Sequence, residues 1–377
     1  FLSKWLGPYP HGELLNIVEI KSDYGGMEHA GKILYNASGL LLEESATQNQ
    51  HLGRASVIAH ETAHMWFGDL VTTESWSNLT LNESFANYSQ VLWDEYKYGK
   101  DAADEHNYTE MAGYLGSKSE KKDLVRFYYK DKEDMFDAVS YNKGGRILHM
   151  LRNFVGDSAF FMALNHYLVN HKFKAAEAHQ LRLSFEEITG KDLNWFWNQW
   201  FFGAGHPRLD VNYSYDADKK QAIVVVNQVQ TGDKIFKLPV SIDLWQSNNK
   251  KRYNVWVENK SDTFYLNSDV KPSLINFDAE KVLLGTRKEN KTLDEYAFQY
   301  KIGNYLDRME AIDAAGKKQD DPKGKEILLA AMKDSYHGLR SYAIAKLDLR
   351  KEDLKIAAEP LLVTIAKTDE KRTVKAA

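Results

Sequence analysis

The chain has 377 residues, of which 43% are hydrophobic and 27% are charged, with a formal net charge of −4. Such a length suffices for two or three domains that each bury a hydrophobic core. The near balance of charge argues against a nucleic-acid-binding protein and against an acidic disordered chain. No run of about 18 apolar residues occurs, so the sequence predicts no membrane-spanning segment.

Cysteine is absent from the sequence. A disulfide framework and a thiolate metal site are therefore excluded, and any metal ion must be bound through nitrogen and oxygen atoms. The sequence begins at Phe1 with neither an initiator Met nor a signal-peptide pattern. We expect this start to be a cut, and we assign no compartment, cytoplasmic or exported.

Residues 1–205 are predicted to form the first domain. No proline occurs between residues 11 and 206, and this stretch is rich in residues that favour helices. From Leu81 to Leu92 the apolar residues recur at helical spacing. Near the beginning, residues 14–20 have the composition of a strand. We therefore expect a mostly helical domain with a small sheet near its start.

The character of the sequence changes after this domain. Residues 206–287 contain short runs of β-branched and aromatic residues separated by turn residues, a pattern typical of a small β-sandwich. Residues 288–377 favour helices again, and similar segments begin every 32 residues, at Arg308, Arg340 and Arg372. This period resembles that of HEAT-type helical pairs, which bury their apolar faces against one another. The third segment stops at the end of the chain, so we expect this HEAT-like domain to be truncated.

The strongest chemical signal is the segment His60-Glu61-Thr62-Ala63-His64. On a helix, residues four positions apart project from one face, so both imidazoles can reach a single ion. Apolar neighbours predict that this helix is buried, with Ser56 as its N-cap. Unpaired polar groups in a core cost about 1–3 kcal/mol each. Two histidines and a glutamate at this spacing therefore favour a metal site over ordinary core residues.

A catalytic zinc site has three protein ligands and one open position. Glu83 follows His64 with 18 residues between them, enough for the chain to turn back so that a second helix faces the first. The segment from Thr80 to Glu83 also matches a capping box, in which Glu83 would only stabilise the start of a helix. The residues alone leave both interpretations open, and the two histidines favour Glu83 as the third ligand.

Four segments together resemble the zinc aminopeptidases of the aminopeptidase N and leukotriene hydrolase family, which are gluzincins. They are HETAH at 60–64, NESFA at 82–86, GGMEH at 25–29 and YNKG at 141–144. The resemblance covers residues 10–205 directly, and the predicted later domains fit it. It implies a multidomain α+β fold with a thermolysin-like catalytic domain and one zinc ion per chain. It also implies the removal of single residues from peptides with a free N-terminus.

The resemblance assigns a role to each matching position. His60, His64 and Glu83 would be the zinc ligands, and Glu61 would be the general base that takes a proton from the water activated by zinc. Tyr141 corresponds to the family tyrosine whose hydroxyl stabilises the oxyanion that develops during hydrolysis. Outside the family context, Tyr141 is one of 21 tyrosines and would be interpreted as a packed ring.

Gly25, Gly26, Met27 and Glu28 would bind the substrate. In the family this extended segment lies beside the substrate backbone and its glutamate binds the free α-ammonium group, so Glu28 would determine where cleavage occurs. Without the resemblance, the same residues predict only a surface loop with a glycine pair and a carboxylate.

Three positions depart from the family pattern. His29 stands where Asn is usual, Thr80 where Trp is common, and Ser84 where Gly is common. None of these changes removes a reacting group, and His29 would alter pH dependence or substrate choice if it titrates near neutrality. The N-terminal β-domain of the family, which contributes a further amine-binding residue, is missing from the sequence. We expect that domain to complete the active site.

Two alternatives to an aminopeptidase remain open. A thermolysin-type endopeptidase shares the zinc ligands, but the glycine and glutamate segment argues against it. A non-catalytic scaffold would keep a vestigial metal site and bind a partner through its helical repeats, and the intact ligand and base residues argue against that. The preferred N-terminal side chain, the natural substrate and the oligomeric state are not encoded in these patterns.

Overall fold

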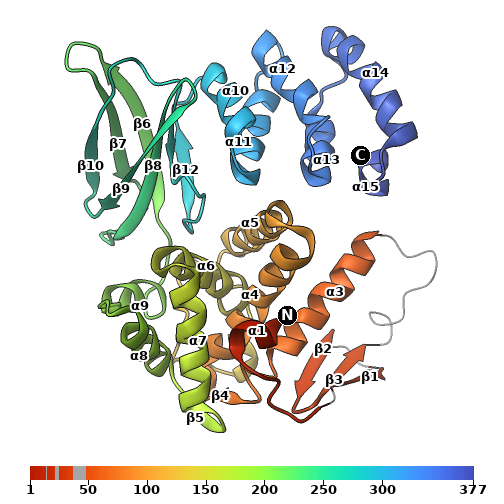
Figure 1. Ribbon diagram of the computed structural model, residues 1–377, viewed down its shortest axis with the longest axis vertical. Helices are drawn as coiled ribbons and strands as arrows, with labels where there is room; N and C mark the ends of the chain where they lie inside the picture. Colours follow the sequence, from red (N-terminus) through yellow and green to blue (C-terminus); the bar gives the residue numbers. More distant parts are fainter. Residues whose placement is uncertain (14, 22–24, 37–47) are drawn as a thin grey trace. The chain divides into compact units, whose positions relative to one another are not determined.

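Figure 1 shows the computed structural model, which describes residues 1–13, 15–21, 25–36 and 48–377, apart from the side chains of residues 48 and 49. The chain divides into two compact units, Phe1–His206 and Pro207–Ala377. Each unit buries its own set of apolar side chains. The division into three domains stays a prediction.

The first unit is mostly helical, as predicted. Its helices are α1 (Leu2–Leu6), α3 (Gln48–Ala63), α4 (Thr80–Tyr98), α5 (Lys100–Gly116), α6 (Gly144–Val155), α7 (Asp157–His171), α8 (Ala178–Thr189) and α9 (Asn194–Trp200), with short turns η1 (Trp76–Asn78), η2 (Lys132–Met135) and η3 (Val139–Lys143). α4 packs against α3, α5 and α6. Most of its first thirteen residues are buried for this reason.

A small sheet near the start of the chain is confirmed. It consists of β1 (Asn16–Ile20), β2 (Gly26–His29) and β3 (Lys32–Asn36), in the order β1-β3-β2. β1 runs parallel to β3, whereas β2 is antiparallel to it. The interpretation of the glycine segment as a surface loop is wrong, because β3 provides the partner that makes it a strand. Residue 14, at the start of the predicted strand, lies outside the described residues.

A second pair of strands, β4 (Val71–Thr73) and β5 (Lys174–Ala176), is parallel. Sequence patterns missed both strands, because three residues are too few to show a period.

Helix α3 carries residues 60–63 of the HETAH segment, with His64 directly after its end, and it differs from its prediction in two respects. It begins at Gln48, so Ser56 lies inside the helix and is not its N-cap. Burial is confined to its C-terminal end, where Glu61 and Ala63 are buried, whereas residues 54–60 are half-buried. Because α3 packs mainly against α4 and β2 (Figure 1), the described chain covers only part of its surface.

The second unit begins with two sheets. Their strands are β6 (Arg208–Asp216), β7 (Gln221–Gln228), β8 (Leu238–Gln246), β9 (Asn249–Val257), β10 (Ser261–Asn267), β11 (Leu274–Phe277) and β12 (Thr286–Glu289). The sheet orders are β10-β7-β6-β12 and β11-β8-β9. The short β-branched and aromatic runs predicted in this region correspond to β6 through β11. β12 was missed because its sequence, Thr-Arg-Lys-Glu, lacks apolar residues; it becomes a strand by pairing in parallel with β6.

Helices complete the second unit. They are α10 (Leu293–Ile302), α11 (Tyr305–Gly316), α12 (Pro322–Ala331), α13 (His337–Lys346), α14 (Glu352–Thr368) and α15 (Arg372–Ala376). The sequence repeat has a structural counterpart in a recurring ion pair. Arg308 pairs with Asp334, and Arg340 pairs with Asp369, each aspartate lying just after a following helix. None of the described helices combines the length and apolar character that crossing a membrane requires.

Candidate active site

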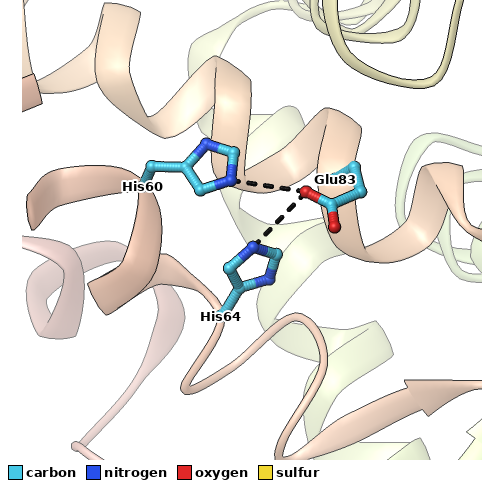
Figure 2. Close-up of side chains that lie close together, drawn as sticks. All are labelled: His60, His64 and Glu83. Carbon is cyan, nitrogen blue, oxygen red and sulfur yellow. Dashed lines mark ion pairs between the residues drawn. The ribbon is translucent and has the colours of Figure 1, made fainter. Parts of the chain in front are cut away.

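The C-terminal end of α3 and the first turn of α4 bring the three predicted ligands together (Figure 2). His60 Nε2 lies 3.3 Å from Glu83 Oε2, and His64 Nε2 lies 3.5 Å from the same oxygen. The centroids of the two imidazole rings are 4.9 Å apart, as positions i and i+4 require. Between the helices the chain turns at Gly68, whose φ of 139° is accessible to glycine.

The capping-box interpretation of Glu83 is wrong. α4 begins at Thr80, its N-cap is Leu79, and no side chain caps this helix. The Thr80 hydroxyl instead lies 2.6 Å from Ser84 Oγ. The Glu83 carboxylate faces the two imidazoles instead of the start of its own helix (Figure 2).

The Nδ1 atom of each histidine faces an oxygen acceptor. His60 Nδ1 lies 3.3 Å from Gln90 Oε1, and His64 Nδ1 lies 2.9 Å from the carbonyl oxygen of Phe67. Because these oxygens only accept hydrogen bonds, Nδ1 is the protonated nitrogen and Nε2 faces Glu83. Metal-ligating histidines are held in this way, with the outer nitrogen donating to an oxygen.

Sequence reasoning missed Gln90. Its amide nitrogen donates to Ser56 Oγ on α3 at 2.7 Å, so this side chain connects α4 to the helix that carries the histidines. Gln90 follows Glu83 by seven residues. Two helical turns place both side chains on one face of α4, and this spacing is the signal that could have identified Gln90.

The charges of the cluster fit a metal ion. Glu83 is 5% exposed, and its Oε2 atom has no hydrogen-bond partner among the described residues. Burial would raise the pKa of Glu83, but contacts with His60 and His64 lower it to about 2. Burial would likewise lower the pKa of His64, yet Glu83 raises it to about 10. The negative charge of buried Glu83 is balanced by a protonated imidazole or by a metal ion, and two imidazoles with one carboxylate form a ligand set of catalytic zinc.

Glu61 lies at the same site, with 6% of its surface exposed. Burial raises its pKa, and the neighbouring His60 and His64 offset part of that effect. Its carboxylate packs against Gly26 of β2, where a Cβ atom would overlap with Glu61 Oε1. The absence of a side chain at Gly26 thus lets β2 approach α3 closely.

Strand β2 places the predicted substrate-binding residues on two faces, because side chains alternate along a strand. Gly26 and Glu28 are half-buried, whereas Met27 is 36% exposed. Glu28 Oε1 lies 3.9 Å from His64 Nδ1, so this carboxylate borders the ligand cluster. Among the described contacts, none joins Gly25 or the Met27 side chain to that cluster.

Tyr141 lies in the π-helical turn η3. Its ring stacks on His60, with 6.0 Å between centroids and 12° between planes. Burial raises the pKa of the Tyr141 hydroxyl above its ordinary value, and the negative charge of Glu83 raises it further. Tyr141 therefore keeps its proton at neutral pH and remains a hydrogen-bond donor beside the cluster.

Comparison with known proteins places this geometry in a family. Residues 1–200 match the Peptidase family M1 domain. The chain is 32% identical over 265 residues to probable aminopeptidase 1 of Sulfurisphaera tokodaii, covering 67% of this chain and 32% of that protein. It is 30% identical over 287 residues to leucyl aminopeptidase of Saccharolobus solfataricus, covering 71% of this chain and 34% of that protein. The chain thus spans about a third of the length of these relatives.

Among solved structures, aminopeptidase A of Legionella pneumophila in complex with aspartic acid matches with a TM-score of 0.77 at 18% identity. The match covers 94% of this chain and 46% of that chain. At this identity the likeness shows the fold alone. Since the family domain matches more than half of the chain and includes every site residue described above, the chain belongs to peptidase family M1, as its four motifs indicated.

Proposed function

We propose that this chain carries the catalytic site of a zinc aminopeptidase, which hydrolyses the first peptide bond of peptides with a free N-terminus. One observation carries the proposal: His60 Nε2 and His64 Nε2 converge on one buried oxygen of Glu83 in a member of family M1. The aminopeptidase names of its relatives support the reaction class.

His60, His64 and Glu83 would hold one zinc ion per chain. Zinc is proposed over other divalent ions because imidazole and carboxylate ligands around a three-ligand site suit it. When bound, zinc would supply a Lewis acid that polarises the scissile carbonyl and lowers the pKa of water.

Glu61 would move the protons of the reaction. Its carboxylate takes a proton from the attacking water and then delivers it to the nitrogen of the leaving amine, so one group serves first as base and then as acid. The burial and raised pKa of Glu61 support both roles, because a higher pKa lets the carboxyl group hold the proton before passing it on.

Tyr141 would stabilise the negative charge that develops on the carbonyl oxygen of the scissile bond. A neutral hydroxyl donor is worth most where charge appears only in the transition state. The stacking of Tyr141 on His60 supports this role, because it holds the hydroxyl beside the ligand cluster.

Strand β2 would align the substrate. It lies at one edge of the described sheet, so an extended peptide can add to it as a further strand. Glu28, which faces the ligand cluster, would then pair with the α-ammonium group of the peptide. A desolvated ammonium requires such a counter-charge, and this requirement would restrict cleavage to the N-terminal bond.

We further propose a thermolysin-like architecture for residues 1–205, a β-sandwich at 206–287 and HEAT-like pairs at 288–377. The recurring pairs Arg308–Asp334 and Arg340–Asp369 support stacking of successive helical pairs.

One peptide, assayed in free and N-acetylated form, tests the proposed function. We expect cleavage of the free peptide only. Glu28→Ala should reduce this preference about 10- to 100-fold, because it removes a charge-assisted hydrogen bond. Glu19→Ala removes an exposed carboxylate from β1 of the same sheet and should leave the preference unchanged.

The same assay separates the alternatives. Cleavage of both peptides at interior bonds would favour a thermolysin-type endopeptidase. A purified chain with neither zinc nor turnover would favour the non-catalytic scaffold.

A further inference from the structure

The turn that carries Tyr141 has an unusual hydrogen-bond pattern. In an α-helix the Gly144 N–H would donate to the Ser140 carbonyl oxygen, four residues before it. In η3 this N–H instead faces the carbonyl oxygens of Val139 and Tyr141. The π-helical turn therefore frees the Ser140 oxygen from the Gly144 amide, and such turns are frequent at functional sites.

A hydroxyl of α4 satisfies this oxygen. Ser84 Oγ donates to the Ser140 carbonyl oxygen at 2.6 Å. Because Ser84 has one hydroxyl hydrogen and gives it to a carbonyl, the 2.6 Å contact with Thr80 must be a donation from Thr80 to Ser84. Thr80, Ser84 and Ser140 are each at most 2% exposed, so water does not compete for these bonds.

The start of α6 leaves room for this pair of hydroxyls. A Cβ atom at Gly144 would overlap with Ser84 Oγ. Thr80 and Ser84 are also two of the three positions that depart from the family pattern, where Trp and Gly are common and neither has a hydroxyl. Two independent departures thus form one hydrogen-bonded pair that reaches the turn of Tyr141.

We propose that Thr80 and Ser84 are positioning residues that fix the Tyr141 turn to the ligand helix. Ser84 directly follows Glu83, so one turn of α4 presents a carboxylate to the histidines and a hydroxyl to η3. The inference rests on the proposed function for the catalytic role of Tyr141. The hydrogen bonds that connect Thr80, Ser84 and the Ser140 carbonyl oxygen do not depend on that catalytic role.

Loss of the Ser84 hydroxyl should leave the chain folded, because other contacts keep η3 attached. Asn142 Nδ2 donates to Glu110 Oε2 on α5 at 2.8 Å. Asp137 Oδ1 accepts from the amides of Val139 and Ser140 at 2.9 and 3.2 Å. Ser84→Ala therefore changes how tightly the turn is held and does not remove it.

Hydrogen exchange of the amides in residues 139–145 tests whether Ser84 holds η3 against α4, and this measurement does not require activity. In the full 377-residue chain, Ser84→Ala should make these amides exchange about tenfold faster. This is the effect expected when the stability supplied by one buried hydrogen bond is lost. Thr80→Val, which leaves the Ser84 hydroxyl in place, should produce a smaller increase. Ser89→Ala is the matched control. Ser89 is buried on the same helix and its hydroxyl donates to the carbonyl oxygen of Phe85, so its loss should leave the exchange of residues 139–145 unchanged. Unchanged exchange in Ser84→Ala would overturn the inference.

Turnover tests the consequence for Tyr141. Ser84→Ala should lower kcat about tenfold and leave KM within about twofold of its wild-type value. The lost hydrogen bond positions Tyr141, whose hydroxyl would stabilise the transition state. In a Tyr141→Phe background the same change should have no further effect. An equal loss in both backgrounds would overturn the positioning role. If Tyr141→Phe keeps full turnover, the proposed function of Tyr141 fails, while the exchange measurement still decides whether Ser84 holds the turn.

Discussion

The carboxylate of Glu83 is buried between two imidazoles, and its charge must be balanced there. Protonated His64 can supply the balance, as its pKa of about 10 indicates. A metal ion can supply it as well, through the Nε2 atoms that face Glu83. Proton and metal compete for the same nitrogen lone pairs, so binding of the ion releases protons from the cluster. The charge and geometry of these residues are therefore those of a group that could hold a metal ion.

His106 makes a pH-dependent contribution to stability away from that cluster. Its Nδ1 atom lies 2.7 Å from Asp94 Oδ2, and its Nε2 atom lies 3.7 Å from Glu110 Oε1. Burial would lower the pKa of His106, but both carboxylates raise it to about 9. The folded-state pKa thus exceeds the unfolded value of about 6.5. The stabilisation is complete below that pH and is lost as the pH rises through 9.

Urea unfolding at about pH 6 and about pH 10 measures this contribution. Between the two conditions, wild type should lose about 1–3 kcal/mol more of its free energy of unfolding than His106→Gln. His179→Gln, which changes an exposed histidine, should behave as wild type does. The same pH dependence in wild type and His106→Gln would show that His106 is not the group responsible.

At the scale of elements, α3 and α4 form the site only in a fixed mutual register. Gln90 sets part of that register, since it contacts His60 and Ser56 on α3 with the two ends of one amide. Gln90→Leu should weaken zinc binding about 10- to 100-fold, as loss of such an outer hydrogen bond does. Competition with a chelating indicator measures the affinity.

Gln90→Glu is the matched variant for this prediction. It keeps an acceptor for His60 Nδ1 and should bind zinc about as tightly as wild type. If Gln90→Leu bound zinc with wild-type affinity, His60 would not depend on Gln90.

Sequence patterns predicted the elements whose signal lies within one segment. Helical spacing placed His60 and His64 on one face, and runs of β-branched residues marked β6 through β11. A fixed gap then indicated Glu83. Tyr141 and Glu28 came from the resemblance alone, because a tyrosine or a glycine-rich segment carries no distinctive period.

The features that were missed depend on partners distant in sequence. β12 is a strand because β6 pairs with it, and Tyr213 of β6 donates a hydrogen bond to its Glu289 at 2.5 Å. Gln90 and Ser84 are polar residues on a helix, a pattern shared with many solvated positions. Their roles follow from what α3 and η3 place against them.

At the scale of the whole molecule, buried charges join strands and helices within the second unit. Lys281, which follows β11, lies 3.0 Å from Asp307 Oδ1 on α11. The side chains of this pair are 2% and 4% exposed. A buried pair adds little net stability, but removal of Asp307 would leave buried Lys281 without the nearer of two neighbouring carboxylates, the other being Glu310 at 3.8 Å.

Asp307→Ala should therefore destabilise the second unit by about 3–5 kcal/mol. Hydrogen exchange of β11 and α11 in increasing urea follows this unit separately from the first, which global unfolding would not do. Asp294→Ala is the control, because that side chain is 86% exposed and its loss should cost less than about 0.5 kcal/mol. Similar exchange in the two variants would mean that the buried pair does not hold this unit together.

The most direct measurement is the zinc content of the purified chain and two variants, with turnover recorded alongside. We predict one zinc per chain in wild type and in Glu61→Gln, with turnover of Glu61→Gln reduced about 10²- to 10⁴-fold. We predict that Glu83→Ala retains no zinc after the same purification. Full zinc content in Glu83→Ala, or none in wild type supplied with the metal, would contradict the assignment of His60, His64 and Glu83 as the ligands.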